Sequence, residues 1–77
     1  MSTTTTLRGT VTAVHRRTNL NGQPWSEVEL RGGGQRVLVF PKEHAWFQHH
    51  LTEGAAVEIT GRHDGQHLFA HQIAARR

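Results

Sequence analysis

Hydrophobic and polar residues alternate along most of this chain, and the alternation predicts short β-strands. Residues 7–17 (LRGTVTAVHRR) predict a long first strand in which Leu7 and Val11 face inward and Val14 is the next large inward residue. This slip of one position indicates a β-bulge, and Gly9 suits a strongly bent strand. We therefore expect a curved first strand that belongs to both halves of a small barrel.

Two more strand-like segments follow, separated by a glycine turn. Residues 25–31 (WSEVELR) alternate strictly, which puts Glu27 and Glu29 on the outer face of the second strand. Three glycines at 32–34 turn the chain into residues 37–40 (VLVF), a β-branched and aromatic run. The inner face of these strands is expected to carry Val28, Leu30, Val37, Val39 and Phe40.

The hydrophobic period changes after Pro41, which indicates a short helix. Pro41 ends the sheet ladder because it has no N–H, and its fixed φ suits the first position of a helix. His44, Phe47 and Leu51 follow with the i, i+3, i+7 spacing of one helix face, and Gly54 is a natural stop. One strand is therefore expected to pass directly into one helix.

The rest of the chain predicts a β-hairpin. Residues 55–63 and 66–74 alternate, and Asp64-Gly65 between them is a typical two-residue turn signal. The order of three strands, a helix and two strands is the arrangement of the all-β, five-stranded OB-fold barrel. The inward residues of the hairpin are expected to be Val57, Ile59, Leu68, Ala70 and, after a second slip in the alternation, Ile73.

Composition limits the size and the setting of the protein. Seventy-seven residues suit one small domain, and the absence of cysteine excludes a disulfide framework. We expect residues 1–6, a threonine run, to be a flexible leader and residues 7–77 to form a single OB-fold domain. No apolar run has membrane-spanning length and no signal segment opens the chain, so a cytoplasmic protein without a membrane partner is expected.

Charge adds a mild preference for a polyanionic partner. Nine Lys and Arg against six Asp and Glu give a net charge of +3, and eight of the nine cations are arginine. A polyanion suits this surplus. A GC-rich genome, which favours arginine over lysine, explains it comparably well.

Four motifs lie in order along the chain. They are L-x-G-x-V from Leu7, V-x-V-F-P ending at Pro41, L-x-x-G-x-x-V-x-I-x-G from Leu51 to Gly61, and L-x-A-x-x-I from Leu68. Together they resemble the OB-fold nucleic-acid-binding domain of the anticodon-binding type, which is found in bacterial DNA polymerase III alpha subunits and in class II aminoacyl-tRNA synthetases. The resemblance implies binding of single-stranded DNA or RNA on the outer face of strands two and three and in the flanking loops.

Single-strand binders combine a basic groove with aromatic side chains on which bases stack. Trp25 either stacks on a base or covers the end of the barrel, whereas Phe69 lies out of phase with its inward neighbours and should face outward. Trp46, beside the inward stripe of the helix, is expected to be partly buried. The residues expected to contact nucleic acid are Arg16, Arg17, Trp25, Arg31, Arg36, Leu38, Arg62, His63 and Phe69.

Glu27 and Glu29 depart from the pattern of the resembling family. Two carboxylates on the outer face of the second strand are expected to repel a phosphate backbone that passes over them. A carboxylate can also accept a hydrogen bond from the amino group of cytosine or guanine. These residues argue against tight, nonspecific binding.

Metal binding and catalysis find little support in the sequence. His63, His67 and His71 straddle the last hairpin, but no carboxylate or cysteine stands beside them at a ligand-like spacing, so solvated histidines are expected. Ser26 lacks a G-x-S-x-G setting and no G-x-x-x-x-G-K-[ST] motif is present. We expect neither an enzyme nor a cofactor.

Two functions from different classes are consistent with these patterns. The first is a small OB-fold protein that binds single-stranded DNA or RNA through backbone charge and one or two stacked bases. The alternative is an OB-fold module that contacts other protein subunits or itself. In that case Leu38, Phe69 and the outward carboxylates would form the interface.

Overall fold

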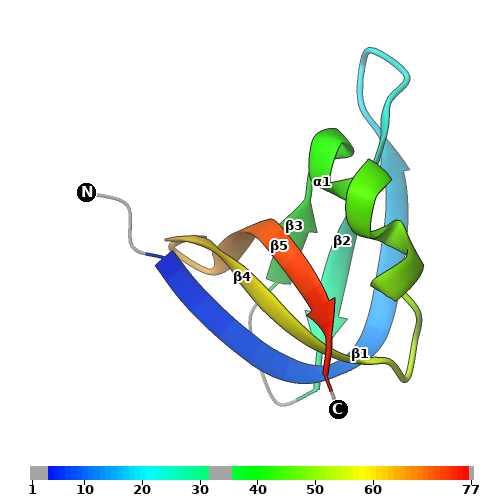
Figure 1. Ribbon diagram of the computed structural model, residues 1–77. Coiled ribbons are helices and arrows are strands. Elements are labelled where there is room, and N and C mark those ends of the chain that lie inside the picture. Colours follow the sequence, from blue (N-terminus) through cyan, green and yellow to red (C-terminus); the bar gives the residue numbers. More distant parts are fainter. Residues whose placement is uncertain (1–3, 32–35, 77) are drawn as a thin grey trace.

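The computed structural model describes residues 4–31 and 36–76, which form five strands and a short helix (Figure 1). The elements are β1 (Thr4–Thr18), β2 (Pro24–Leu30), β3 (Arg36–Val39), α1 (Pro41–Phe47), the 3-10 helix η1 (Gln48–His50), β4 (Ala56–Asp64) and β5 (His67–Ala75). No helix in this part of the chain is long and apolar enough to cross a membrane.

The strands close into a barrel in the order β1-β2-β3-β5-β4. β3 and β5 run parallel, and the other neighbouring strands are antiparallel. The first part of β1 pairs with β4 and its second part with β2, and Figure 1 shows how this strand curves along the barrel to reach both. A five-stranded barrel with a helix between the third and fourth strands is the OB fold. The predicted fold class is confirmed.

β1 begins earlier than expected and contains the predicted bulge. Thr4–Thr6 pair with β4, so this part of the expected leader belongs to the strand, while residues 1–3 lie outside the described residues. The register shifts between Val11 and Ala13, where the strand changes partner from β4 to β2. Val14 packs against the core beyond the shift. The slip in the hydrophobic pattern therefore marks the bend that lets one strand serve both halves of the barrel.

The core is aliphatic and fills the barrel. A second register shift, between Thr60 and Gly61 of β4, explains the slip before Ile73. The inward residues predicted for β2, β4 and β5 all belong to the core. Its buried members are Val11, Val28, Leu30, Val37, Val39, Leu51, Val57, Ile59, Leu68, Ala70 and Ile73.

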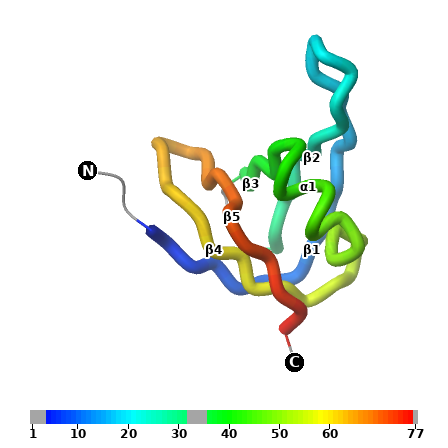
Figure 2. Tube along the Cα trace, turned by 45° about the horizontal axis from the view of Figure 1, so that its top comes forward, coloured from blue at the N-terminus to red at the C-terminus, as the bar shows by residue number. Residues whose placement is uncertain are grey.

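The helical segment covers one end of the barrel and begins at Pro41, as predicted. In Figure 2 it lies across the end of the barrel, and α1 contacts both β2 and β5. Nδ1 of the buried His44 lies 3.1 Å from the hydroxyl of Ser26, an inward residue of β2. α1 ends at Phe47, earlier than predicted, and η1 carries the chain to the buried Leu51. The helix is thus joined to the barrel by apolar contacts and one buried polar contact.

Two predictions about aromatic residues are wrong. Phe40 was expected to face inward, but β3 ends at Val39 and the Phe40 side chain is 43% exposed on the outside of the barrel. Trp46 was expected to be partly buried, but it is 59% exposed. The short α1 turns His44 and Phe47 toward the barrel and leaves Trp46 in solvent, with the Lys42 ammonium 5.2 Å from its ring centroid.

Turns join β1 to β2 and β4 to β5 in the described residues. The side-chain oxygen of Asn19 accepts hydrogen bonds from the backbone N–H groups of Asn21 and Gln23, and so organises the loop between β1 and β2. β4 and β5 are joined by a two-residue turn at Gly65 and Gln66, one residue later than the predicted Asp64-Gly65, because Asp64 still pairs with His67 at the end of β4. Gly65 has a φ of 60°, a value that favours glycine. The glycine turn expected at 32–34 lies outside the described residues.

Candidate functional site

The outer faces of β2, β3 and β5 form one continuous surface. The register places Glu27, Leu38 and Phe69 side by side on the three strands, with Arg62 of β4 next to Phe69. Side chains alternate along a strand, so residues two positions away lie on the same side. We call this surface the β2–β3–β5 face and define it by Trp25, Glu27, Arg36, Leu38, Phe40 and Phe69.

Three aromatic rings meet on the β2–β3–β5 face. The ring centroid of Phe40 lies 6.0 Å from that of Trp25 and 5.4 Å from that of Phe69. The guanidinium carbon of Arg62 lies 5.7 Å from the Phe69 centroid, close enough for a cation–π contact. Trp25 and Phe69 are half-buried, so part of each ring remains open to a ligand. Aromatic rings beside a cation are the groups that stack on bases and attract phosphates.

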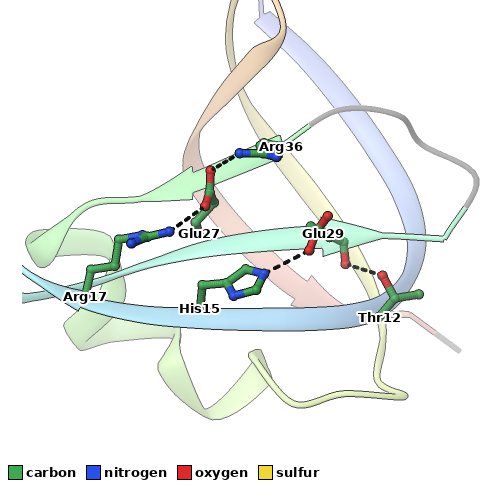
Figure 3. A network of polar contacts seen from close by, with 6 residues as sticks. All are labelled: Thr12, His15, Arg17, Glu27, Glu29 and Arg36. Atoms are coloured by element: carbon green, nitrogen blue, oxygen red, sulfur yellow. Dashed lines mark hydrogen bonds and ion pairs between the residues drawn. The ribbon is translucent and has the colours of Figure 1, made fainter.

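A buried carboxylate lies between two arginines on this face (Figure 3). Glu27 is 8% exposed and accepts hydrogen bonds of 3.3 Å from both Arg17 of β1 and Arg36 of β3. Burial raises the pKa of the Glu27 carboxyl, but the hydrogen bond from Arg17 and the positive charge of Arg36 outweigh burial and hold the pKa below its usual value. Glu27 is therefore ionised at neutral pH and holds the two guanidinium groups in place.

The second glutamate of β2 also has partners on β1. Oε2 of Glu29 lies 2.9 Å from Nε2 of His15, and the Thr12 hydroxyl donates to the Glu29 carbonyl oxygen at 3.1 Å. Figure 3 shows that these contacts continue the Glu27 network along β2.

The expectation of two bare carboxylates facing a phosphate backbone is therefore corrected. Glu27 faces outward by register, as predicted, but the side chains of Arg17 and Arg36 lie against it and balance its charge. Glu29 is partly exposed and paired with His15. The sequence did not reveal this arrangement because the partners come from neighbouring strands.

The structure gathers most of the predicted contact residues on or beside the β2–β3–β5 face. Arg31 is exposed directly after β2, next to residues outside the described ranges. His63 pairs with Leu68 and therefore lies on the other side of β4 from Arg62. The residues that lie together are Arg17, Trp25, Arg36, Leu38, Arg62 and Phe69.

Arg16 does not join this group. It pairs with the inward Ser26 and lines a separate hollow with Leu51 and Glu53. Burial lowers the pKa of His44, and the positive charge of Arg16 lowers it further. Arg16 thus lies toward the helix end of the barrel, although it is adjacent in sequence to Arg17.

A hollow of about 620 Å³ adjoins the Trp25 end of the face. Two of its walls, Trp25 and Phe40, belong to the β2–β3–β5 face. Oε2 of Glu43 is buried and has no hydrogen-bond partner among the described residues. Sequence reasoning missed this hollow because it placed Phe40 inward and found no motif in the loop or the helix start. The lining residues are Asn19, Gln23, Trp25, Phe40, Pro41, Lys42 and Glu43.

Within residues 4–31 and 36–76, no three His, Asp or Glu side chains are placed so that they could hold a metal ion. The ring centroids of His49 and His50 lie 4.0 Å apart. Burial lowers the pKa of His50, and the charge of His49 lowers it further.

Comparison with known proteins finds a relative that matches part of this chain and solved structures with a similar fold. No family model matches the chain. DNA polymerase III subunit alpha from Saccharopolyspora erythraea is 36% identical over an alignment of 58 residues, which covers 73% of this chain and 5% of that protein. The chain therefore spans a small fraction of the length of the curated relative it matches.

One of the similar structures is the crystal structure of the mitochondrial single-stranded DNA binding protein from S. cerevisiae. Its TM-score is 0.75, with 16% sequence identity and coverage of 100% of this chain and 97% of that chain. At this identity the likeness establishes the fold alone. The chain is an OB-fold barrel of the kind that forms this single-stranded DNA binding protein.

Proposed function

We propose that the protein binds single-stranded DNA or RNA across the β2–β3–β5 face. The observation that carries this proposal is the series of ring contacts from Trp25 through Phe40 to Phe69, with Arg62 against the last ring. Aromatic rings stack on any base, and guanidinium groups attract phosphates, so this surface suits a single strand whose bases are unpaired. Leu38, beside Phe69, extends the apolar surface.

The electrostatics of the face support the same proposal. Arg17 and Arg36 share the single negative charge of Glu27, so the three groups together carry a net positive charge. A phosphate backbone would meet exposed guanidinium groups there. The names of the two similar proteins describe a DNA polymerase subunit and a single-stranded DNA binding protein. Both names also favour a nucleic-acid ligand for this chain.

Binding of fluorescently labelled oligo-dT and oligo-U, followed by anisotropy at low salt, tests the proposal. Phe69→Ala should weaken binding about tenfold or more, because removal of one stacking ring costs about 1–3 kcal/mol per base. The matched control is Trp46→Ala, which removes an exposed ring of α1 that is not part of the β2–β3–β5 face and should leave the affinity unchanged. Thermal melts of both variants establish that they are folded at the temperature of the assay. Absence of oligonucleotide binding by the unaltered chain would overturn the proposal.

Protein–protein contact is the second candidate function. Leu20 at the β1–β2 loop is fully exposed and Trp46 is 59% exposed, and apolar side chains in such positions suit a protein partner. Sedimentation that shows concentration-dependent self-association, in a chain that binds no oligonucleotide, would favour this function.

A further inference from the structure

We infer that the hollow beside Trp25 is a pocket for one nucleobase, and that it prefers an amino-bearing base, above all guanine, to thymine or uracil. This inference rests on the proposed function, because a strand on the β2–β3–β5 face would deliver the base. It adds a site of base selection to a face that binds without regard to sequence.

The position and size of the hollow suit one base from such a strand. Trp25 and Phe40 line the hollow and also stand on the face, so the two surfaces are continuous. Its volume of about 620 Å³ falls in the range of small-molecule sites. A base that leaves the stack at Phe69 can therefore enter the hollow while its neighbours remain on the face.

Glu43 supplies the chemistry of selection. Its Oε2 atom is buried without a hydrogen-bond partner among the described residues, and a desolvated carboxylate oxygen without a donor is unfavourable. Glu43 lines the hollow, and the terminal torsion of a glutamate is broad, so its carboxylate can turn toward a ligand there. A ligand that brings N–H groups would satisfy this carboxylate.

Asn19 and Lys42, which also line the hollow, have contacts of their own. The Asn19 side-chain oxygen accepts two backbone N–H groups, and its Nδ2 donates to the side-chain oxygen of Gln23 at 3.2 Å. The Lys42 ammonium lies over the Trp46 ring. Glu43 is thus the acidic residue among those that line the hollow, and its Oε2 atom is a hydrogen-bond acceptor without a partner among the described residues.

The four bases differ in how well they match a carboxylate. Guanine presents two adjacent donors, N1–H and the N2 amino group, which can engage both carboxylate oxygens. Adenine and cytosine present one amino group beside an acceptor nitrogen. Thymine and uracil present a single N–H between two carbonyl oxygens, which the carboxylate repels. Single-strand binders read these Watson–Crick edges because the bases are unpaired.

The test compares an oligo-dT with the same oligo-dT carrying one central dG. The unaltered protein should bind the dG oligonucleotide about tenfold more tightly, the discrimination of one well-placed base contact. Glu43→Gln should reduce this ratio to less than about twofold. Glu53→Gln makes the same change of charge outside the hollow and should keep the preference.

A second measurement separates the pocket from the proposed function. Trp46→Phe leaves Trp25 as the single indole of the chain, so its fluorescence reports on the hollow. Guanosine should quench it more strongly than uridine, and Glu43→Gln should remove the difference. Oligo-dT binding with no preference for dG or guanosine overturns the pocket and leaves the proposed function standing. Selective quenching by guanosine without oligonucleotide binding supports the pocket and overturns the proposed function. Absence of both oligonucleotide binding and selective quenching by guanosine overturns both proposals.

Discussion

Glu27 is a carboxylate held between two guanidinium groups, and its position sets the charge of the β2–β3–β5 face. The exposed fraction of its side chain is 11%, whereas those of Arg17 and Arg36 are 52% and 61%. Exposed ion pairs contribute little to stability, but a buried charge that loses its partners is strongly unfavourable. Glu27 therefore acts mainly as a positioning residue, which fixes two cations at the surface.

His44 makes stability depend on pH. Burial and the charge of Arg16 lower its pKa in the folded protein, whereas in the unfolded chain the imidazole titrates near 6.5. Between these two values the unfolded chain binds more protons than the folded one, so stability falls as pH decreases below about 6.5. We expect the melting temperature measured by circular dichroism to decrease from pH 7.5 to pH 5.5.

Substitution identifies the histidine responsible. His44→Gln, which keeps a polar group near Ser26, should flatten this part of the pH profile even if it lowers the melting temperature throughout. His71→Gln, at an exposed position of β5, should retain the slope of the unaltered chain. An unchanged slope in His44→Gln would contradict the assignment, and the lowered pKa of His50 would then be the next cause to test.

At the scale of elements, the β4–β5 ladder positions Phe69 through a close backbone approach at Gly61. A Cβ atom at Gly61 would overlap the carbonyl group of Phe69, which is backbone and cannot rotate away. Gly61→Ala should therefore lower the free energy of unfolding by about 3 kcal/mol, at the upper end of the range for overpacked sites. Urea denaturation followed by fluorescence measures the change.

Gly9 is the matched control for this prediction. A Cβ atom there would lie 3.5 Å from Cβ of Leu30, an ordinary contact, and its φ is compatible with an L side chain. Gly9→Ala should change the free energy of unfolding by less than about 1 kcal/mol. Equal losses in the two variants would show that the approach at Gly61 is not specific. Both glycines belong to the sequence motifs. Comparison of the two variants therefore shows whether glycine is required for steric reasons at Gly61, whereas at Gly9 it only suits the bend of β1.

The strands and their bends could be predicted from the sequence because each is encoded locally. The slips before Val14 and Ile73 appear in the hydrophobic pattern itself, and both coincide with register shifts. The pattern could not show that β3 ends one residue before Phe40 or that α1 has seven residues. Both boundaries depend on how the helix packs on the barrel. This packing involves residues far apart in the sequence and cannot be derived from the local hydrophobic pattern.

At the scale of the whole molecule, closure of the barrel decides which charges act together. Arg16 and Arg17 are adjacent in sequence but lie on opposite sides of β1, because alternate side chains of a strand point to opposite faces. Glu27 is paired with residues nine and ten positions away, on two different strands. Most of the basic residues near the face could be identified from the sequence. Which of them lie on the face and which lie at the helix end of the barrel could be seen only from the strand topology.

This partition predicts how strongly binding depends on salt. For single strands, the logarithm of the binding constant falls with the logarithm of the salt concentration, with a slope of about −0.7 for each phosphate neutralised. If the five arginines predicted to contact nucleic acid acted together, the slope would be about −3.5. Arg16 and Arg31 lie apart from the β2–β3–β5 face, and Glu27 cancels one charge of Arg17, Arg36 and Arg62. About two effective cations remain, so the expected slope is about −1.4. Oligo-dT titrations at pH 7.5 over a range of sodium chloride concentrations measure it.

Neutralising Glu27 should return one cation to the face. Glu27→Gln keeps the size of the side chain and an acceptor oxygen for Arg17 or Arg36, so the slope should steepen to about −2.1. Glu58→Gln makes the same change of charge in the pair with Arg8, on the β1–β4 side of the barrel, and should leave the slope near its original value. If the two variants steepen the slope equally, net charge rather than the β2–β3–β5 face governs binding. If Glu27→Gln alone does so, the phosphates pass beside Arg17 and Arg36.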